Sequence, residues 1–247
     1  MDISSGWDLV VLGSGPAGEA AAMQAAKGGL RVAMVDRDDQ MGGNCTHWGT
    51  IPSKALRHQV RQVVRSQRNP LLRGLISPRQ VRWQDLIQRS REVVDSQVQV
   101  RTDFYVRNRV RLFNGQGRIE SAGEVRVDDQ AGRQWSLRTR NILIATGSRP
   151  FLPEIDGIET VEALDSWDLL SLPDQPESIL VLGGGYIGCE LAQMASRLGV
   201  KVTLVTRSRL LPGVEPEVAK ALTDALKAEG VAVETGLSYR SVRRSDG

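Results

Sequence analysis

Glycines at a fixed spacing are the first residues of this chain that could do chemistry. Residues 13–18 read G-S-G-P-A-G directly after an apolar run, and an Ala-rich stretch follows them. In that setting the first glycine (Gly13) allows a tight turn, the second (Gly15) lets the backbone approach a pyrophosphate, and the third (Gly18) lets a helix pack closely on a strand. Free N–H groups at the start of the helix would face the phosphates. The spacing therefore predicts a dinucleotide-binding turn, called the first fingerprint below.

An acidic residue stands where such a site would hold a ribose. Asp36 follows the glycines by about 20 residues, at the end of a second apolar run. Its carboxylate would accept hydrogen bonds from ribose hydroxyls, and its charge would repel a 2′-phosphate. We therefore expect this site to take FAD or NAD and not NADP.

The same arrangement recurs at residues 183–188, the second fingerprint, which read G-G-G-Y-I-G. Repetition of a whole strand–turn–helix–strand unit predicts two dinucleotides held in two domains. Here Thr206 replaces the acid, and Arg207 and Arg209 follow it. A carboxylate about 4 Å from one phosphate charge would cost roughly 4 kcal/mol at an effective dielectric near 20. The absence of this carboxylate, together with guanidinium groups that can bind phosphate through two N–H donors, therefore admits NADP. The threonine hydroxyl still allows NAD, and plain surface arginines are the alternative interpretation.

Hydrophobic periodicity predicts the elements that position these residues, in an α/β fold with two Rossmann-like dinucleotide-binding domains. Strands are expected at residues 7–13, 31–35, 141–145, 178–182, 201–205 and 231–233, those at 7–13 and 141–145 buried, and helices at about 15–27, 52–67, 83–108, 187–198 and 215–229. Glycine-punctuated segments at 110–113, 118–120, 125–127 and 135–137 predict an antiparallel meander. A loop is expected at 69–82, and a Pro-rich crossing at 151–177 separates domains at 1–150 and 151–247. Core positions expected on the long helix are Leu86, Ile87, Val93, Val94 and Val98.

Composition excludes several classes of protein. A hydrophobic fraction of 40% and a charged fraction of 25% are typical of a soluble globular chain. The net charge of +3 is spread without a long basic run, so we expect no nucleic-acid partner. No apolar run approaches the roughly 20 residues of a membrane span, and only residues 1–6 precede the first expected strand, so we expect neither a membrane partner nor a signal peptide. Two distant cysteines make no disulfide framework, so a cytoplasmic location and no metal site are expected.

Residues 42–54, between the two fingerprints, read G-G-N-C-T-H-W-G-T-I-P-S-K. The stretch resembles the G-G-x-C-x-x-x-x-C-x-P-x-K motif of the flavoprotein disulfide reductases (glutathione reductase, lipoamide dehydrogenase, mercuric reductase), in which the two cysteines form a disulfide on the flavin. Cys45 matches the first cysteine and Lys54 matches the tail, but Thr50 stands in place of the second cysteine. The wording most resembles that of the soluble pyridine nucleotide transhydrogenases, a branch of the same family.

The resemblance implies an FAD-dependent NAD(P)+ transhydrogenase, with hydride passing between NADPH and NAD+ through flavin by ping-pong kinetics. A threonine hydroxyl neither ionises near neutral pH nor forms a disulfide, so the electrons would leave on a second nicotinamide. The only other thiol, Cys189, would need its Cα within about 7 Å of that of Cys45, and this pairing is not expected. An NAD(P)H:quinone reductase or diaphorase, and a non-catalytic nucleotide-binding fragment, are the alternatives.

Two residues are expected to be catalytic by their place in the motif. The resemblance puts Lys54 beside flavin N5 and pairs it with Glu190 from the NAD(P) domain; an exposed helix lysine is the alternative. Tyr186 matches a tyrosine that covers the empty nicotinamide pocket in glutathione reductase. The A-T-G turn that ends at Gly147 matches a turn near the flavin ribityl chain. The whole set expected to bind cofactors is Gly13, Gly15, Pro16, Ala17, Gly18, Asp36, Arg37, Gly42, Gly43, Asn44, Cys45, Thr50, Lys54, Gly117, Thr146, Gly147, Gly183, Gly185, Tyr186, Ile187, Gly188, Glu190, Thr206 and Arg207.

The resemblance covers nearly all 247 residues but only the front half of the family's usual layout. We therefore expect a first FAD segment and an incomplete NAD(P) domain, with the dimer-forming domain absent. The expected partners are nicotinamide nucleotides as substrates and, for the full-length protein, further copies of itself.

Overall fold

The computed structural model describes residues 6–71 and 81–243, in two compact units. The first unit comprises Met1–Ser53 and Arg91–Arg149, and the second comprises Lys54–Ser90 and Pro150–Gly247. Neither unit is therefore one continuous stretch of chain. The assignment of domains to 1–150 and 151–247 stays a prediction.

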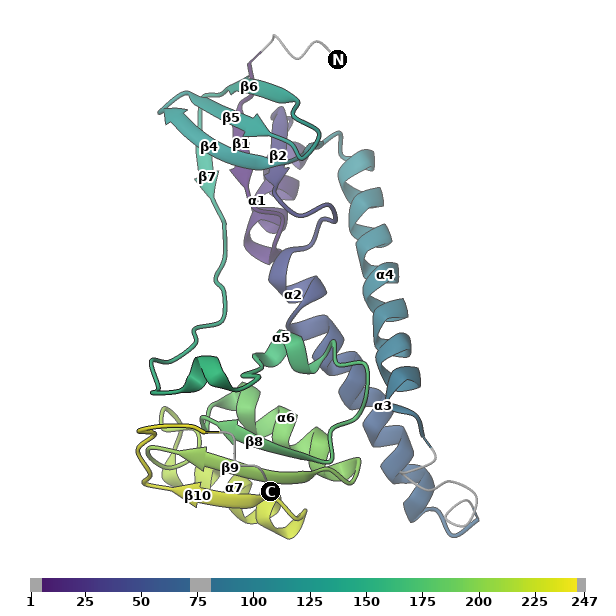
Figure 1. Cartoon of the computed structure of the whole chain (residues 1–247). Coiled ribbons are helices and arrows are strands. Elements are labelled where there is room, and N and C mark those ends of the chain that lie inside the picture. Colours follow the sequence, from purple (N-terminus) through teal and green to yellow (C-terminus); the bar gives the residue numbers. More distant parts are fainter. Residues whose placement is uncertain (1–5, 72–80, 244–247) are drawn as a thin grey trace. The chain divides into compact units, whose positions relative to one another are not determined.

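A parallel sheet forms the centre of the first unit (Figure 1). Its strands are β1 (Leu9–Leu12), β2 (Val32–Asp36), β3 (Arg111–Asn114) and β7 (Ile142–Ile144), in the order β3-β2-β1-β7. Helix α1 (Pro16–Lys27) connects β1 to the parallel strand β2. All five residues of β2 are buried, as expected of a strand inside a parallel sheet.

A second, antiparallel sheet packs in the same unit. Its strands are β4 (Gln116–Ser121), β5 (Glu124–Asp128) and β6 (Gln134–Arg138), in sequence order. Val125 and Val127 of β5 are fully buried and share a core with Leu12 and Val35 of the parallel sheet. Alternating burial along β5 thus attaches the meander to the parallel sheet.

Two expectations about these strands are wrong. Residues 110–113 were expected in the meander, but β3 pairs in parallel with β2, because a short apolar run does not specify which strand it will pair with. The segment 141–145 was expected to be buried, but β7 pairs with β1 alone among the described strands, and Ile144 is 65% exposed.

The helices between these strands are α2 (Gly43–His47), α3 (Thr50–Arg68) and α4 (Trp83–Arg107). On α4, Leu86, Ile87 and Val94 are buried as expected and Val98 is partly buried, whereas Val93 is 40% exposed. The expectation for Val93 is wrong because only one stripe of an amphipathic helix can face the core. Residues 72–80 of the expected loop lie outside the described residues.

The second unit repeats the parallel strand–helix pattern of the first. Strands β8 (Ser178–Leu182), β9 (Lys201–Thr206) and β10 (Ala232–Thr235) form a parallel sheet in the order β10-β9-β8, with helices α6 (Tyr186–Arg197) and α7 (Pro216–Ala228) between them. The crossing at 151–177 contains the short helices η2 (Ile158–Thr160) and α5 (Ser166–Leu169). Leu56 and Val60 of α3 and Trp83 of α4 pack with Leu191 and Leu198 of α6. This core explains why residues 54–90 cluster with the second unit.

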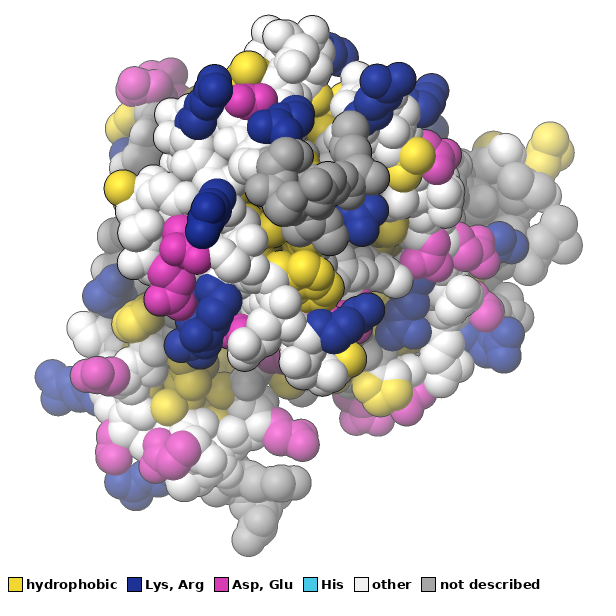
Figure 2. Space-filling model, turned by 90° about the horizontal axis from the view of Figure 1, so that it is seen from above, with side chains coloured by type: hydrophobic (Ala, Val, Ile, Leu, Met, Phe, Trp, Pro, Cys, Tyr) yellow, Lys and Arg dark blue, Asp and Glu magenta, His cyan; other side chains and the backbone are white. Residues whose placement is uncertain are grey.

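Charged side chains are mixed over the face shown in Figure 2, where Lys and Arg alternate with Asp and Glu. Among the described helices, none has the length and apolar character needed to cross a bilayer.

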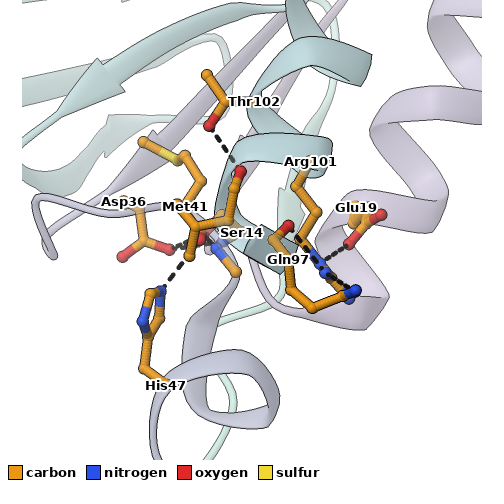
Figure 3. Close-up of polar contacts among 10 residues, drawn as sticks. Ser14, Glu19, Asp36, Met41, His47, Gln97, Arg101 and Thr102 are labelled. Carbon is orange, nitrogen blue, oxygen red and sulfur yellow. Dashed lines mark hydrogen bonds and ion pairs between the residues drawn. The ribbon is translucent and has the colours of Figure 1, made fainter. Parts of the chain in front are cut away.

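A polar seam joins α1 to α4 within the first unit (Figure 3). The Arg101 guanidinium donates from Nε to Glu19 Oε2 at 3.0 Å and from Nη1 to the backbone and side-chain oxygens of Gln97. The side chains of Arg101 and Glu19 are only 16% and 25% exposed. One turn further along α4, Tyr105 is fully buried, and its hydroxyl has no hydrogen-bond partner among the described residues. Burial raises the pKa of Tyr105, and the Glu19 carboxylate raises it further.

We predict that Arg101→Gln destabilises the first unit by about 1–3 kcal/mol, because it leaves the Glu19 carboxylate partly buried without its cation. Urea unfolding monitored by circular dichroism measures this change. The double variant E19Q/R101Q should recover part of the loss, and Arg91→Gln, an exposed position on the same helix, serves as the control. A double variant as unstable as the sum of the two single variants would contradict the prediction.

Tyr105→Phe should leave the free energy of unfolding at pH 7 unchanged or raise it by about 1 kcal/mol, because it removes a buried donor without a partner. The ordinary pKa of tyrosine is 10.0 and that of folded Tyr105 is higher, so above pH 10 only the unfolded chain ionises there. Stability present below that pH is therefore lost as the pH rises, and Y105F should flatten this loss. Tyr239→Phe is the matched comparison, because the Tyr239 hydroxyl donates to Val205 O and its removal should destabilise at pH 7. A clear loss of stability in Y105F at pH 7 would contradict the prediction.

Candidate functional site

Steric limits inside the chain explain two glycines of the first fingerprint. Gly13 has a φ of +106°, and a Cβ there would lie 2.2 Å from Ala145 O. A Cβ on Gly18 would lie 1.9 Å from Gly13 O, so the first turn of α1 packs directly on the loop that precedes it. The turn and the close helix packing expected from the sequence are therefore present.

Gly15 and Gly185, the middle glycines of the two fingerprints, are different. Gly15 is the N-cap of α1 with φ −65° and ψ 177°, and Gly185 is the N-cap of α6 with φ −75° and ψ 175°. Any residue can adopt these angles, and an added Cβ would meet nothing within 4 Å at either position. The chain itself thus does not require glycine there. Open space beside the free N–H groups of a helix N-terminus fits the close approach of a pyrophosphate.

Asp36 is held at the first fingerprint by Ser14 (Figure 3). Asp36 Oδ2 accepts from Ser14 N at 2.7 Å and from Ser14 Oγ at 2.5 Å, and Asp36 Oδ1 accepts from Asp38 N at 3.1 Å. Ser14 Oγ in turn accepts from Gly42 N at 2.8 Å. The acid expected to bind a ribose therefore also fixes the turn. Sequence reasoning missed Ser14, whose signal is a hydroxyl between the first two glycines.

The motif at 42–54 begins against the same turn. A Cβ on Gly43 would lie 2.8 Å from Gly15 Cα, so α2 starts beside the first fingerprint. Asn44 Oδ1 and Thr46 Oγ1 are buried without hydrogen-bond partners among the described residues. Buried polar atoms are rarely left unpaired, so these two fit a site that a bound ligand completes.

Both cysteines are free thiols. Cys45 in α2 is partly buried, and Cys189 in α6 is buried. Burial raises the pKa of the Cys189 thiol, which disfavours the reactive thiolate. Neither cysteine therefore forms a disulfide within the described part of the chain.

The other predicted residues of the first unit differ in their surroundings. Thr146 Cα would lie 3.3 Å from a Cβ on Gly13, and Gly147 follows it with a φ of +68°. Pro16 and Ala17 are exposed on the first turn of α1, and Thr50 is the first residue of α3. Arg37 is exposed beside Asp38, whereas Gly117 is packed against Leu12 of β1, where a Cβ would lie 2.9 Å from Leu12 Cδ2.

The second fingerprint has the same geometry in the second unit. Gly183 has a φ of +119°, and a Cβ on Gly188 would lie 2.2 Å from Gly183 O. Tyr186 and Ile187, on the first turn of α6, are 75% and 47% exposed. Thr206 ends β9 and is only 6% exposed, while Arg207 is exposed.

The structure brings the two expected catalytic residues together within the second unit. Lys54 Nζ lies 2.8 Å from Glu190 Oε1 and 2.7 Å from Oε2, and Arg57 Nη1 lies 3.6 Å from Oε1. The Lys54 and Arg57 side chains are each 53% exposed, so the ion pairs add about 1 kcal/mol or less to stability. The arrangement fixes the position of a lysine ammonium group and does little for the fold. Sequence reasoning missed Arg57, which lies one turn after Lys54 on α3.

Comparison with known proteins places this chain among close relatives. A soluble pyridine nucleotide transhydrogenase of Pseudomonas putida (strain W619) is 44% identical over 241 residues, which are 97% of this chain and 52% of the relative. One from Chromohalobacter salexigens is 43% identical and covers 96% of this chain and 51% of the relative. The Cu(II) complex of the HOCl-induced flavoprotein disulfide reductase RclA from Escherichia coli is similar in structure, with a TM-score of 0.84, 28% identity, and coverage of 98% of this chain and 52% of that one.

This chain thus spans about half the length of the curated relatives it matches. The model of the family described as pyridine nucleotide-disulphide oxidoreductase matches residues 7–247. The chain therefore belongs to the FAD- and NAD(P)-dependent pyridine nucleotide-disulphide oxidoreductase family.

Proposed function

We propose that the protein containing this chain is an FAD-dependent NAD(P)+ transhydrogenase, which moves hydride between NADPH and NAD+. The observation that carries the proposal is Thr50 at the place of the second cysteine of the motif, in a chain whose two cysteines are free. The names of its 43–44% identical relatives support the same activity. With no dithiol to accept electrons, a second nicotinamide nucleotide is the simplest acceptor.

The two fingerprints divide the nucleotides between them in this proposal. Asp36 gives the first fingerprint a carboxylate that repels a 2′-phosphate, so residues 1–150 would bind FAD. The second fingerprint lacks that charge, so residues 151–247 would bind NADPH and NAD+ in turn, with ping-pong kinetics. When bound, FAD supplies the hydride chemistry, and the protein supplies position and electrostatics.

Lys54 and Glu190 are the proposed catalytic residues. Glu190 receives two charge-assisted hydrogen bonds from Lys54 and lies near the Arg57 guanidinium. Two cations on one carboxylate leave a net positive charge, which favours negative charge on a reduced group nearby. Fixing the ammonium group before reaction avoids the cost of reorganising it during the reaction.

An NAD(P)H:quinone reductase is the second candidate, because it too needs no dithiol. Comparing the turnover of a quinone with that of thio-NAD+ under the same NADPH supply separates the two functions. A non-catalytic nucleotide-binding fragment would show neither turnover.

We predict that the purified holoprotein is yellow, is bleached by NADPH without oxygen, and regains its colour when NAD+ or thio-NAD+ is added. Stopped-flow absorbance at the flavin band measures both half-reactions. Oxidised glutathione and lipoamide are the controls and should leave the bleached protein unchanged. Brisk reoxidation by either disulfide, or none by NAD+, would contradict the proposed function.

Glu190→Gln should slow reduction by NADPH by about 10- to 100-fold, because the ammonium group of Lys54 loses the carboxylate that fixes it. Lys54→Met should slow it at least as much, with the same nucleotide affinity. Arg61→Gln, at an exposed position one turn after Arg57 on α3, is the matched control and should behave as the wild type. Rates in E190Q equal to those of the wild type would remove this residue from the proposed site.

A further inference from the structure

Residues 207–214, the selector loop, follow β9 at the edge of the sheet where a bound nucleotide places its ribose. The loop is attached to the second fingerprint at two points. Leu211 N donates to Gly184 O at 2.8 Å. Leu210 is fully buried, and a Cβ added to Gly184 would lie only 2.7 Å from Leu210 Cδ2. The loop and the turn that would receive the pyrophosphate therefore form one packed structure.

Leu211 is held in an unfavourable backbone conformation. Its φ is +45°, in the left-handed region that costs free energy for a residue with a branched side chain. Its N–H bonds to Gly184 O, and its own carbonyl accepts from Val214 N at 3.0 Å. Strain of this kind persists only where surrounding contacts determine the conformation, and it is concentrated at functional sites.

Arg209 supplies the contact that closes the loop. Its Nη2 donates to Pro212 O at 3.0 Å and to Val214 O at 2.7 Å. A guanidinium group can fork onto a phosphate through Nε with Nη2 or through Nη1 with Nη2, and both forks use Nη2. Because that nitrogen is bonded to two backbone carbonyls, Arg209 has no free fork to offer a 2′-phosphate.

Arg207 is the opposite case. It is exposed, and within residues 6–71 and 81–243 neither a hydrogen bond nor an ion pair holds its guanidinium group. The backbone beneath it is fixed, since Thr206 is 6% exposed and its carbonyl accepts from Leu237 N, while Val205 O accepts from Tyr239 Oη at 2.8 Å. A cation with a free fork thus stands on a rigid strand end.

We propose that Arg209 is a positioning residue that fixes the selector loop against the second fingerprint and so supports the binding of NADPH and NADH alike, while Arg207 alone discriminates between them. This inference rests on the proposed function only in taking both nucleotides as ligands of the second fingerprint. The two arginines, which look equivalent in the sequence, would thus have different roles.

The test is to measure the dissociation constants of NADP+ and NAD+ for the flavin-loaded protein and for its variants, by fluorescence titration without turnover. Arg207→Gln should weaken NADP+ by about tenfold or more and leave NAD+ within about twofold. Arg209→Gln should weaken both nucleotides by a similar factor, and Arg209→Lys should restore part of the loss, because an ammonium group can still reach one carbonyl. Lys227→Gln, which removes one exposed charge from α7, controls for net charge and should change neither constant.

Hydrogen exchange gives a second readout that a phosphate ligand would not move. In the nucleotide-free protein, R209Q should speed exchange at the amides of Leu211 and Val214, and R207Q should leave both unchanged. The inference is overturned if R209Q weakens NADP+ alone, or if the loop amides exchange at the wild-type rate. If the wild type binds neither NADP+ nor NAD+, both the proposed function and this inference are wrong. If the wild type binds both nucleotides but R209Q weakens NADP+ alone, only this inference is wrong.

Discussion

In each fingerprint, the residue between the first two glycines fixes the glycine turn through hydrogen bonds to a later segment of the chain. In the first unit this residue is Ser14, whose hydroxyl donates to Asp36 and accepts from Gly42 N. In the second unit it is Gly184, whose carbonyl accepts from Leu211 N. In both units, therefore, the turn after the first strand is bonded to the segment that follows the second strand. A dinucleotide site needs this link because the phosphates and the ribose are bound by these two different segments.

The chemistry of the link differs between the units and accounts for their different charges. The first link is made by the Ser14 hydroxyl, which donates a hydrogen bond to the carboxylate of Asp36, a residue that is 8% exposed. A backbone carbonyl makes the second, and it needs no acid at the end of β9, where Thr206 packs against Gly184. The backbone link thus leaves the end of β9 without a negative charge, while the turn keeps its bond to the segment that follows β9.

Local patterns predicted most of the elements because each carries its own signal. The strand–G-x-G-x-x-G–helix units and the long helix α4 were expected from such patterns, and the structure contains them. The pairing of Lys54 with Glu190 joins residues 136 positions apart, and it was expected only from the family resemblance. What could not be predicted depends on partners distant in sequence. The apolar run of β3 does not specify that it will pair with β2 rather than with β4, and the two arginines after β9 look alike until the carbonyls of Pro212 and Val214 are placed. The Ser14–Asp36–Gly42 connection is likewise a contact across 22 and 28 positions of the chain.

A transhydrogenase needs a nucleotide site that does not prefer one substrate too strongly. Each 1.4 kcal/mol of preference is a factor of about ten in affinity, so two guanidinium groups forked onto a 2′-phosphate would hold NADPH far more tightly than NADH. Because Arg209 is bonded to the carbonyls of its own loop, one of these two guanidinium groups does not contribute to the preference for NADPH. The buried Thr206 adds no charge. The remaining cation, Arg207, can favour NADPH moderately while leaving NAD+ able to compete. The balance of affinities that hydride exchange requires would thus follow from where one arginine side chain finds its hydrogen-bond acceptors.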